Sequence, residues 1–263
     1  MKATAILTYQ WKDLLRGKWI IGYGLIFLLF TDVLIRFGGG GPRALLSVSN
    51  IILLFIPLVS MIYGVLFLYQ SREFTELLLA QPIDRKTLFR GLYGGLAVPL
   101  SLAFSGGVGL PLIYMGVLFS GGGSGALLLL GLGVMLTLLF TGLGFMIGLK
   151  FFDDRIRGFG FALLCWLFLA VLYDGIILAV VFLLGDYPLE KPVLILSLLN
   201  PVDLSRIVVL LKFDISALMG YTGAVFSRFF AGTSGISVAV GLLLLWTGLP
   251  LWRSMRLFNK KDF

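Results

Sequence analysis

Residues 71–86 read SREFTELLLAQPIDRK and form the most charged segment of a very apolar chain. Long hydrophobic runs flank this segment on both sides. Phe74, Leu77 and Leu78 recur at helical spacing, while the charged residues fall mostly on the opposite side. Pro82 ends the helix, because proline lacks an amide hydrogen and disfavours helical geometry in the residue before it. This pattern fits a docking element for a partner in the water phase, and it fits a plain solvated loop equally well.

The composition of the whole chain predicts the protein class. Hydrophobic residues make up 59% of the 263 residues and charged residues only 13%, whereas a soluble domain is typically about half apolar and about a quarter charged. So little polar surface cannot cover a globule in water. The chain is therefore predicted to be an all-α integral membrane protein with a single transmembrane domain over residues 1–263.

Several kinds of chemistry are excluded by what the chain lacks. It has no histidine and a single cysteine, Cys165, which excludes imidazole catalysis, histidine metal sites and internal disulfides. No G-x-x-x-x-G-K-[ST] phosphate loop occurs in the sequence. We expect a non-catalytic subunit with no metal and no cofactor of its own, and an intramembrane hydrolase is strongly disfavoured.

Six apolar runs are long enough to cross about 30 Å of hydrocarbon. An amphipathic surface helix over residues 1–18 is expected before them, and a separate short turn over 84–90 before the third. The predicted spans cover residues 19–36, 46–69, 91–119, 126–149, 159–184 and 236–255.

The distribution of lysine and arginine predicts the orientation of the chain. Short loops rich in these residues stay in the cytoplasm. If both termini are cytoplasmic, most of the 21 basic residues lie inside, and six lie outside: Arg36, Arg43, Lys191, Arg206, Lys212 and Arg228. The net charge of +8 therefore indicates orientation and anionic lipid rather than nucleic acid.

The segment 185–235 is too interrupted to span and too apolar for a plain linker. Asn200 and Pro201 are typical of a helix start, with Asp203 in the first turn. A second amphipathic helix is expected from Asp214 onward. We expect both helices to rest on the outer surface or against the bundle. Residues expected to meet a partner outside the membrane are Asn200, Pro201, Asp203, Arg206 and Tyr221.

Asp32 and Asp174 are the acids most expected at membrane depth, where ionisable groups are costly and often functional. No basic residue lies deep in another predicted span to pair with Asp174. A proton- or ion-coupled secondary transporter using Asp174 is one hypothesis, and a structural hydrogen bond to a neighbouring helix is the other. The two remain open on the sequence.

The segment from Arg72-Glu73 through Thr75-Glu76-Leu77 to Gln81-Pro82-Ile83 resembles the signature after the second span of type-two ABC exporter permeases. Six spans and a large outer segment fit that family along the whole chain. Further motifs resemble permeases of nitrous oxide reductase maturation transporters: residues 69–74, 200–203, 220–225 and 258–262. The signature here is a shortened form of the family's, which often contains a Gly-Thr-Leu-Glu run.

The resemblance implies a permease homodimer in the bacterial inner membrane, with a separate ABC ATPase bound to each copy from inside. The ATPase would bind ATP and magnesium, and its closure would push on a coupling helix within residues 71–90. For the maturation subfamily, a periplasmic β-helical protein docks outside and the complex supports copper-centre assembly. The coupling residues implied are Arg72, Glu73, Thr75, Glu76, Leu77, Gln81, Pro82 and Arg85.

Overall fold

The computed structural model describes residues 18–38, 41–119, 123–184, 190–213 and 233–261, and every regular element within these ranges is a helix. Six helical spans are long and apolar enough to cross a membrane. The predicted all-α membrane fold with six spans is therefore confirmed. The predicted surface helix over 1–18 and the helix expected after Asp214 lie outside the described residues, apart from Lys18.

Five spans are single helices, and the fifth is composite. The fifth runs through α7, a π-helical turn η2 and α8, and is described as one apolar span over Arg155–Leu183. The bounds are α2 Trp19–Phe37, α3 Gly41–Gln70, α5 Arg85–Tyr114, α6 Gly123–Lys150, α7 Arg155–Leu167, η2 Phe168–Leu172, α8 Tyr173–Leu183 and α12 Thr233–Lys260. A short helix α4, Arg72–Leu79, follows α3, and a 3-10 turn η1, Val117–Phe119, follows α5.

The predicted bounds of the third and last spans were wrong. Residues 85–90 are not a separate turn but the first turns of α5, because no proline interrupts the helix there. The helix also ends at Tyr114 rather than 119. Likewise α12 continues to Lys260 instead of stopping at 255. In both helices the polar end extends beyond the apolar run that the sequence pattern detected.

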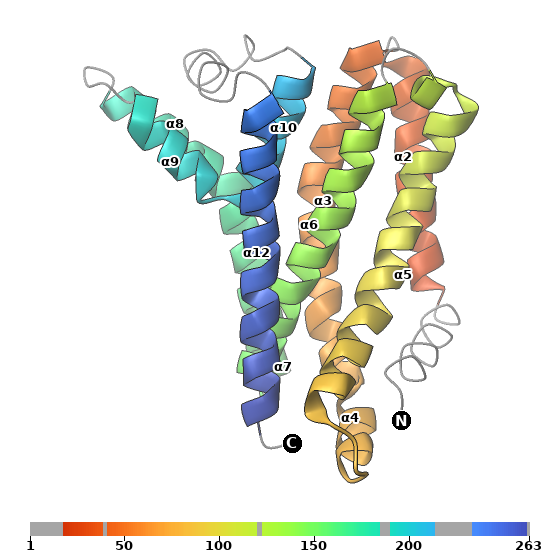
Figure 1. The fold of residues 1–263 in the computed structure, drawn as a ribbon, viewed down its shortest axis with the longest axis vertical. Helices are drawn as coiled ribbons and strands as arrows, with labels where there is room; N and C mark the ends of the chain where they lie inside the picture. Colours follow the sequence, from red (N-terminus) through yellow and green to blue (C-terminus); the bar gives the residue numbers. More distant parts are fainter. Residues whose placement is uncertain (1–17, 39–40, 120–122, 185–189, 214–232, 262–263) are drawn as a thin grey trace.

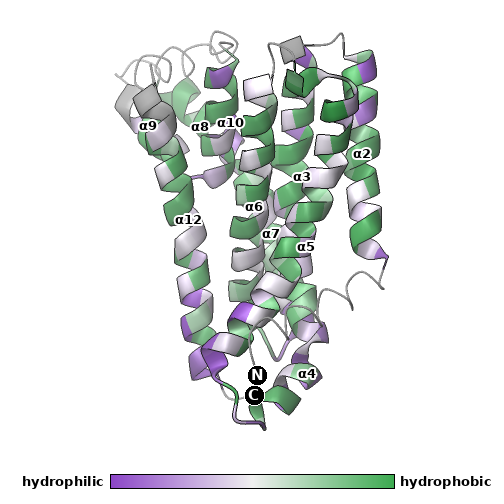
Figure 2. Cartoon of the chain, turned by 45° about the vertical axis from the view of Figure 1, so that its right-hand side comes forward, coloured by the Kyte–Doolittle hydropathy of each residue, from purple (hydrophilic) through white to green (hydrophobic). Residues whose placement is uncertain are grey.

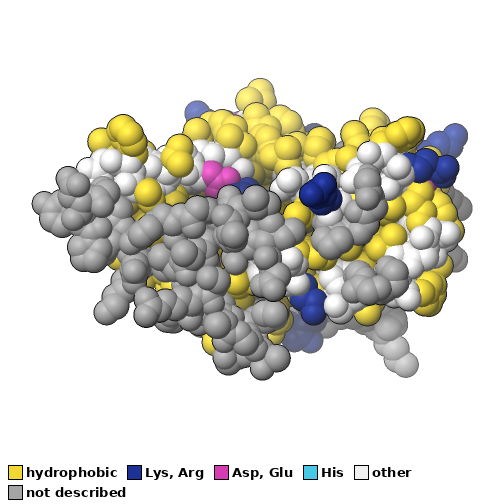
Figure 3. Space-filling model, turned by 90° about the horizontal axis from the view of Figure 1, so that it is seen from above, with side chains coloured by type: hydrophobic (Ala, Val, Ile, Leu, Met, Phe, Trp, Pro, Cys, Tyr) yellow, Lys and Arg dark blue, Asp and Glu magenta, His cyan; other side chains and the backbone are white. Residues whose placement is uncertain are grey.

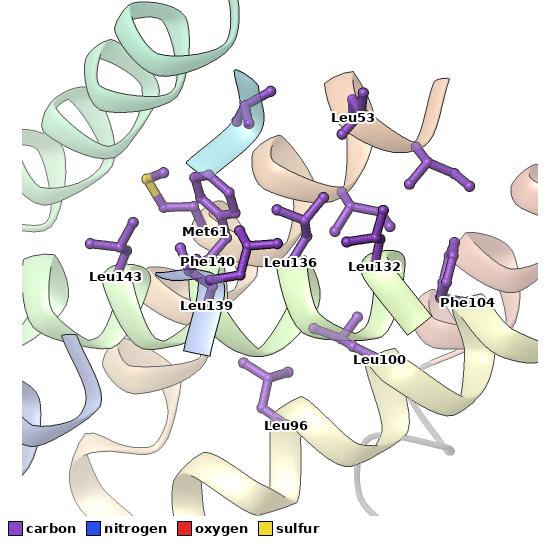
Figure 4. Close-up of a cluster of buried hydrophobic side chains, with 14 of the residues drawn as sticks. Leu53, Met61, Leu96, Leu100, Phe104, Leu132, Leu136, Leu139, Phe140 and Leu143 are labelled. Atoms are coloured by element: carbon purple, nitrogen blue, oxygen red, sulfur yellow. The ribbon is translucent and has the colours of Figure 1, made fainter. Parts of the chain in front are cut away.

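The core of the bundle lies between α3 and α6, which lie side by side at its centre (Figure 1). They approach closely because glycines face each other: a Cβ on Gly144 would lie 2.4 Å from the Met61 carbonyl oxygen and 3.0 Å from the Gly64 Cα. Small residues allow such contacts between membrane helices. Figure 4 shows the buried side chains around this crossing, among them Phe104, Phe140 and Leu136.

The peripheral helices expose apolar surface. α2 packs chiefly on α5. Only 6% of an 18-residue apolar stretch of the fifth span is buried inside the protein, against 61% of the corresponding stretch of α6. Figure 1 shows α8 leaning away from the bundle, and Figure 2 shows hydrophobic residues along the spans, with hydrophilic ones gathered near α4 and the end of α12. Exposed apolar faces of this kind contact lipid in a membrane.

Between the fifth and sixth spans, α9 (Glu190–Leu198) and α10 (Pro201–Lys212) meet at 108°. α10 packs against α3, α6 and α12. The segment 185–235 was expected either on the outer surface or against the bundle. Its described helix α10 lies against the bundle, and most of α10 is buried. This brings polar residues from between the spans into contact with the spans themselves.

Candidate functional site

The short helix α4 begins where α3 stops. Ser71 Oγ donates to the Phe67 carbonyl at 2.7 Å, and Thr75 Oγ1 donates to the Ser71 carbonyl at 2.7 Å. Both side chains are buried, so Thr75 holds the junction rather than facing water. At the other end, the Gln81 amide donates to the Leu78 carbonyl at 3.1 Å before Pro82 turns the chain toward α5. The predicted helix that ends before Pro82 is present.

The two faces of α4 differ from the prediction in one residue. Leu78 is buried and Phe74 packs against the core, but the Leu77 side chain is 70% exposed. Leu77 lies four residues after Glu73, and residues at that spacing share a helix face. Glu73 is exposed too, so the outer face of α4 combines an acid and a leucine. An exposed leucine beside a carboxylate suits contact with a protein surface.

Arg72 and Glu76 pair with each other along the helix. Arg72 Nε lies 2.8 Å from Glu76 Oε1, and its guanidinium stacks 5.0 Å from the centre of the Phe152 ring. Hydrogen bonding to Glu76 raises the pKa of the Arg72 guanidinium, so it stays charged. Glu73, by contrast, has no ion-pair partner within the described part of the chain.

A set of contacts ties α4 and the start of α5 to two distant segments. Arg85 Nη1 donates to the carbonyls of Asn259, in the last turn of α12, and Lys261, just after it, at 3.2 and 2.7 Å. Lys261 Nζ lies 3.3 Å from Asp153 Oδ2, in the α6–α7 connection. Arg85 thus contacts the last helix rather than the exposed face of α4. Its role in coupling stays a prediction.

Asp32 joins two helices at the opposite end of the bundle. Its carboxylate lies 3.0 Å from Arg36 Nε and accepts a hydrogen bond from the Tyr114 hydroxyl at the end of α5. One acid thus holds α2 to α5, and a structural contact accounts for its position.

Asp174 has an ion-pair partner, which the sequence left unidentified. Arg206 Nη1 forms an ion pair with Asp174 Oδ2 and lies 3.4 Å from Asp203 Oδ1. Arg206 lies between the predicted spans, so the sequence does not indicate that it reaches an acid at membrane depth. The bend between α9 and α10 brings it back to the fifth span.

Asn200 lies in the corner where the fifth span meets the start of α10, and it contacts both. Its Oδ1 accepts from the Val202 amide at 3.0 Å, which confirms the predicted helix cap, and its Nδ2 donates to the Leu169 carbonyl in η2 at 2.7 Å. The Tyr173 hydroxyl donates to the Leu196 carbonyl at 2.7 Å, near the end of α9. Side chains from α8 and from the cap of α10 therefore donate to backbone carbonyls of the π turn and of α9.

The residues expected to meet an outer partner lie mostly inside this corner. Asn200, Pro201 and Asp203 are buried, and Arg206 is engaged with two aspartates. Tyr221 lies outside the described residues. Docking by these residues stays a prediction, and their described contacts give the first four an internal structural role. The sequence signal for that role was present in the i, i+3 spacing of Asp203 and Arg206.

Comparison with known proteins yields one relevant likeness. No protein-family model matches the chain. The chain is 25% identical, over 269 aligned residues, to a protein of Pseudomonas aeruginosa described as "Probable ABC transporter permease protein NosY". The alignment covers 95% of this chain and 94% of that protein. This distant similarity confirms the resemblance to an ABC transporter permease that residues 72–83 indicate.

Proposed function

We propose that the chain is the membrane-spanning permease subunit of an ATP-driven ABC transporter. A separate ATPase subunit would bind the exposed face of α4 and supply the ATP and magnesium site. The observation that carries this proposal is the combination of Glu73 and exposed Leu77 on a short helix between two spans, in a chain similar to a permease over nearly its whole length. The chain's own role is then to transmit movement.

The contacts around α4 support such transmission. A displacement of α4 would reach α5 directly, and through Arg85 it would reach the end of α12. Tyr69, at the end of α3, donates to the Phe151 carbonyl at 2.9 Å, which links the α6–α7 connection to the same region. Three of the spans therefore end within one connected group of side chains beneath the proposed docking face.

The finer assignment is part of the proposal. We infer a homodimer of this chain with two ATPase copies, in a bacterial inner membrane with both termini cytoplasmic. The distribution of lysine and arginine supports the orientation. A role in nitrous oxide reductase copper-centre maturation, with a periplasmic β-helical partner, is supported by the description of the Pseudomonas aeruginosa relative as NosY and by the motifs at residues 69–74, 200–203, 220–225 and 258–262.

The experiment is co-expression and co-purification with a candidate ABC ATPase subunit from the same source organism. Glu73→Arg combined with Leu77→Glu should abolish recovery of the complex and the stimulation of ATP turnover in proteoliposomes. Ile156→Glu is the matched control, because Ile156 is 86% exposed at the same end of the bundle but lies on α7. Unchanged recovery of the α4 double variant would refute docking through this face.

A gradient-driven transporter working through Asp174 is the second candidate. The Asp174 side chain is 43% exposed, and Arg206 holds it beside a second aspartate. This function predicts flux in proteoliposomes without nucleotide that Asp174→Asn abolishes. Flux that instead requires the ATPase subunit would eliminate it.

A further inference from the structure

The corner between α8 and α10 holds an uneven set of charges. One guanidinium, that of Arg206, faces two carboxylates, those of Asp174 and Asp203. Viewed from the end of the bundle that carries α10, Figure 3 shows acidic and basic atoms next to each other within a largely apolar surface. With both acids ionised, the cluster has a net charge of about −1, since each side chain carries one unit.

Part of the excess negative charge lies on a buried oxygen atom of Asp203. The Asp203 side chain is only 7% exposed, and its Oδ2 accepts no hydrogen bond from any described residue. An ionised carboxylate oxygen that is removed from water and left unpaired is costly. Arg206 cannot relieve this cost, because its contact with Asp203 goes to Oδ1 at 3.4 Å while its closer contact is with Asp174.

No other described group supplies the missing positive charge. The Tyr173 hydroxyl is committed to the Leu196 carbonyl, and among the described residues none of the ion pairs links another cation to the cluster. α6 and α12 carry their basic residues toward the opposite end. The other charged groups on the elements packed here are Arg43 on α3, Lys150 on α6, Glu190 and Lys191 on α9, Lys212 on α10, and Arg253, Arg256 and Lys260 on α12; the structure describes no side-chain positions for the two on α9.

What the buried Oδ2 atom of Asp203 lacks is a hydrogen-bond donor. Arg206 Nη1 contacts one oxygen of each carboxyl, so the Asp203 carboxyl lies beside the Asp174 carboxyl, but two ionised carboxylates only accept. A proton on either one supplies an O–H donor to the other and brings the net charge of the three groups to about zero. Two carboxyls in contact commonly hold one proton between them for this reason.

We propose that Asp174 and Asp203 together bind one proton at neutral pH, as a single acid held in place by Arg206. Asp174 is the exposed member and gives the proton access to water. Because Asp174 belongs to α8 and Asp203 to α10, the bound proton adds a link between the fifth span and the helix that returns into the bundle. This inference goes beyond the permease function and does not depend on it.

The test measures thermal unfolding of the purified full-length chain in lipid nanodiscs across pH. A proton held more tightly by the folded chain than by the unfolded one stabilises at low pH, and this stability is lost as the pH rises above the ordinary aspartate range. We expect the unfolding midpoint to fall by about 3–5 °C per pH unit over part of that range. Asp203→Asn should remove this pH dependence, because the amide donates at every pH.

Asp32→Asn is the matched control, since Asp32 also forms an ion pair with an arginine but has a tyrosine, not a second acid, beside it. The Asp32→Asn variant should keep the wild-type pH dependence. An identical pH dependence in Asp203→Asn and wild type would overturn the proposal. Infrared difference spectroscopy of the wild type serves if the variant does not fold. A protonated carboxyl band at neutral pH that Asp174→Asn removes supports the shared proton, and the absence of such a band at neutral pH refutes it.

Discussion

Replacing Gly144 by alanine tests the contact between α3 and α6 on which the bundle is built. The added Cβ would lie 2.4 Å from the Met61 carbonyl oxygen and 3.0 Å from the Gly64 Cα. Both obstacles are backbone atoms, so no side chain can rotate out of the way. The two helices must separate instead, and a gap of about 0.5–1 Å forfeits a quarter to a half of each dispersion contact across it.

The expected loss of stability is about 2–3 kcal/mol, the upper part of the range for overpacking a tight core. For a chain of this size that corresponds to an unfolding midpoint lower by roughly 4–12 °C. The assay is thermal unfolding of the purified protein in a fixed detergent, followed by circular dichroism. The control variants are also glycine-to-alanine changes on α6, so the gain in helix propensity is the same in every variant compared.

Gly148→Ala and Gly131→Ala are those controls. A Cβ on Gly148 would meet Val65 Cα at 3.5 Å, an ordinary contact, and a Cβ on Gly131 would meet nothing within 4 Å. Both variants should unfold at or above the wild-type temperature, since alanine favours a helix over glycine by about 1 kcal/mol. If Gly144→Ala unfolds at the same temperature as these two variants, the close crossing of α3 and α6 does not exist as described.

Three further predictions concern side chains that fasten helix ends. Arg85→Gln should free the end of α12 at a cost of about 1 kcal/mol and speed proteolysis of the C-terminal residues, because two backbone carbonyls lose a charged donor. Asn200→Ala should lower stability by about 2–3 kcal/mol in denaturant unfolding, because it removes a helix cap and leaves the half-buried Leu169 carbonyl without this donor. Tyr114→Phe should cost less than about 1 kcal/mol by thermal unfolding, because Asp32 keeps its ion pair with Arg36 in an exposed place.

Conservative variants distinguish these explanations. Lys86→Gln removes an exposed cation next to Arg85 and should leave proteolysis unchanged. Asn200→Ser keeps a cap oxygen but loses the donor to Leu169, so it should fall between wild type and Asn200→Ala; equal stability of all three would show that neither hydrogen bond matters. A loss of several kcal/mol in Tyr114→Phe would mean that Asp32 depends on the tyrosine and not on Arg36.

The parts of the fold set by local pattern were predictable, and those set by tertiary contact were not. Apolar run length located all six spans, and the cap at Asn200 was predicted from its neighbours. Run length ignores polar helix turns beyond the hydrocarbon, so the start of α5 and the end of α12 were missed. Helical spacing alone placed Leu77 on the wrong face, because Leu77 falls near the border between the faces and only packing decides the burial of such a residue.

The partner of Asp174 was missed for a different reason. Arg206 follows Asp174 by 32 residues, and no periodicity reports a contact across that separation. The contact follows from the 108° bend between α9 and α10, which the sequence signals only as a helix start after Asn200-Pro201. The contacts among Arg85, Lys261 and Asp153 likewise depend on ends of different helices that meet in space.

The π turn in the fifth span fixes how α8 is rotated. A π turn holds about one residue more than an α turn, so converting Phe168–Leu172 to α-helix would rotate all of α8 by about 100° about its axis. That rotation would carry Asp174 away from Arg206 and turn a different set of apolar side chains toward the lipid. Asn200 blocks it from outside the helix, since its amide is bonded to the Leu169 carbonyl. The face that the fifth span presents to its surroundings is therefore held in part by side chains that lie beyond the span, Asn200 at Leu169 and Arg206 at Asp174.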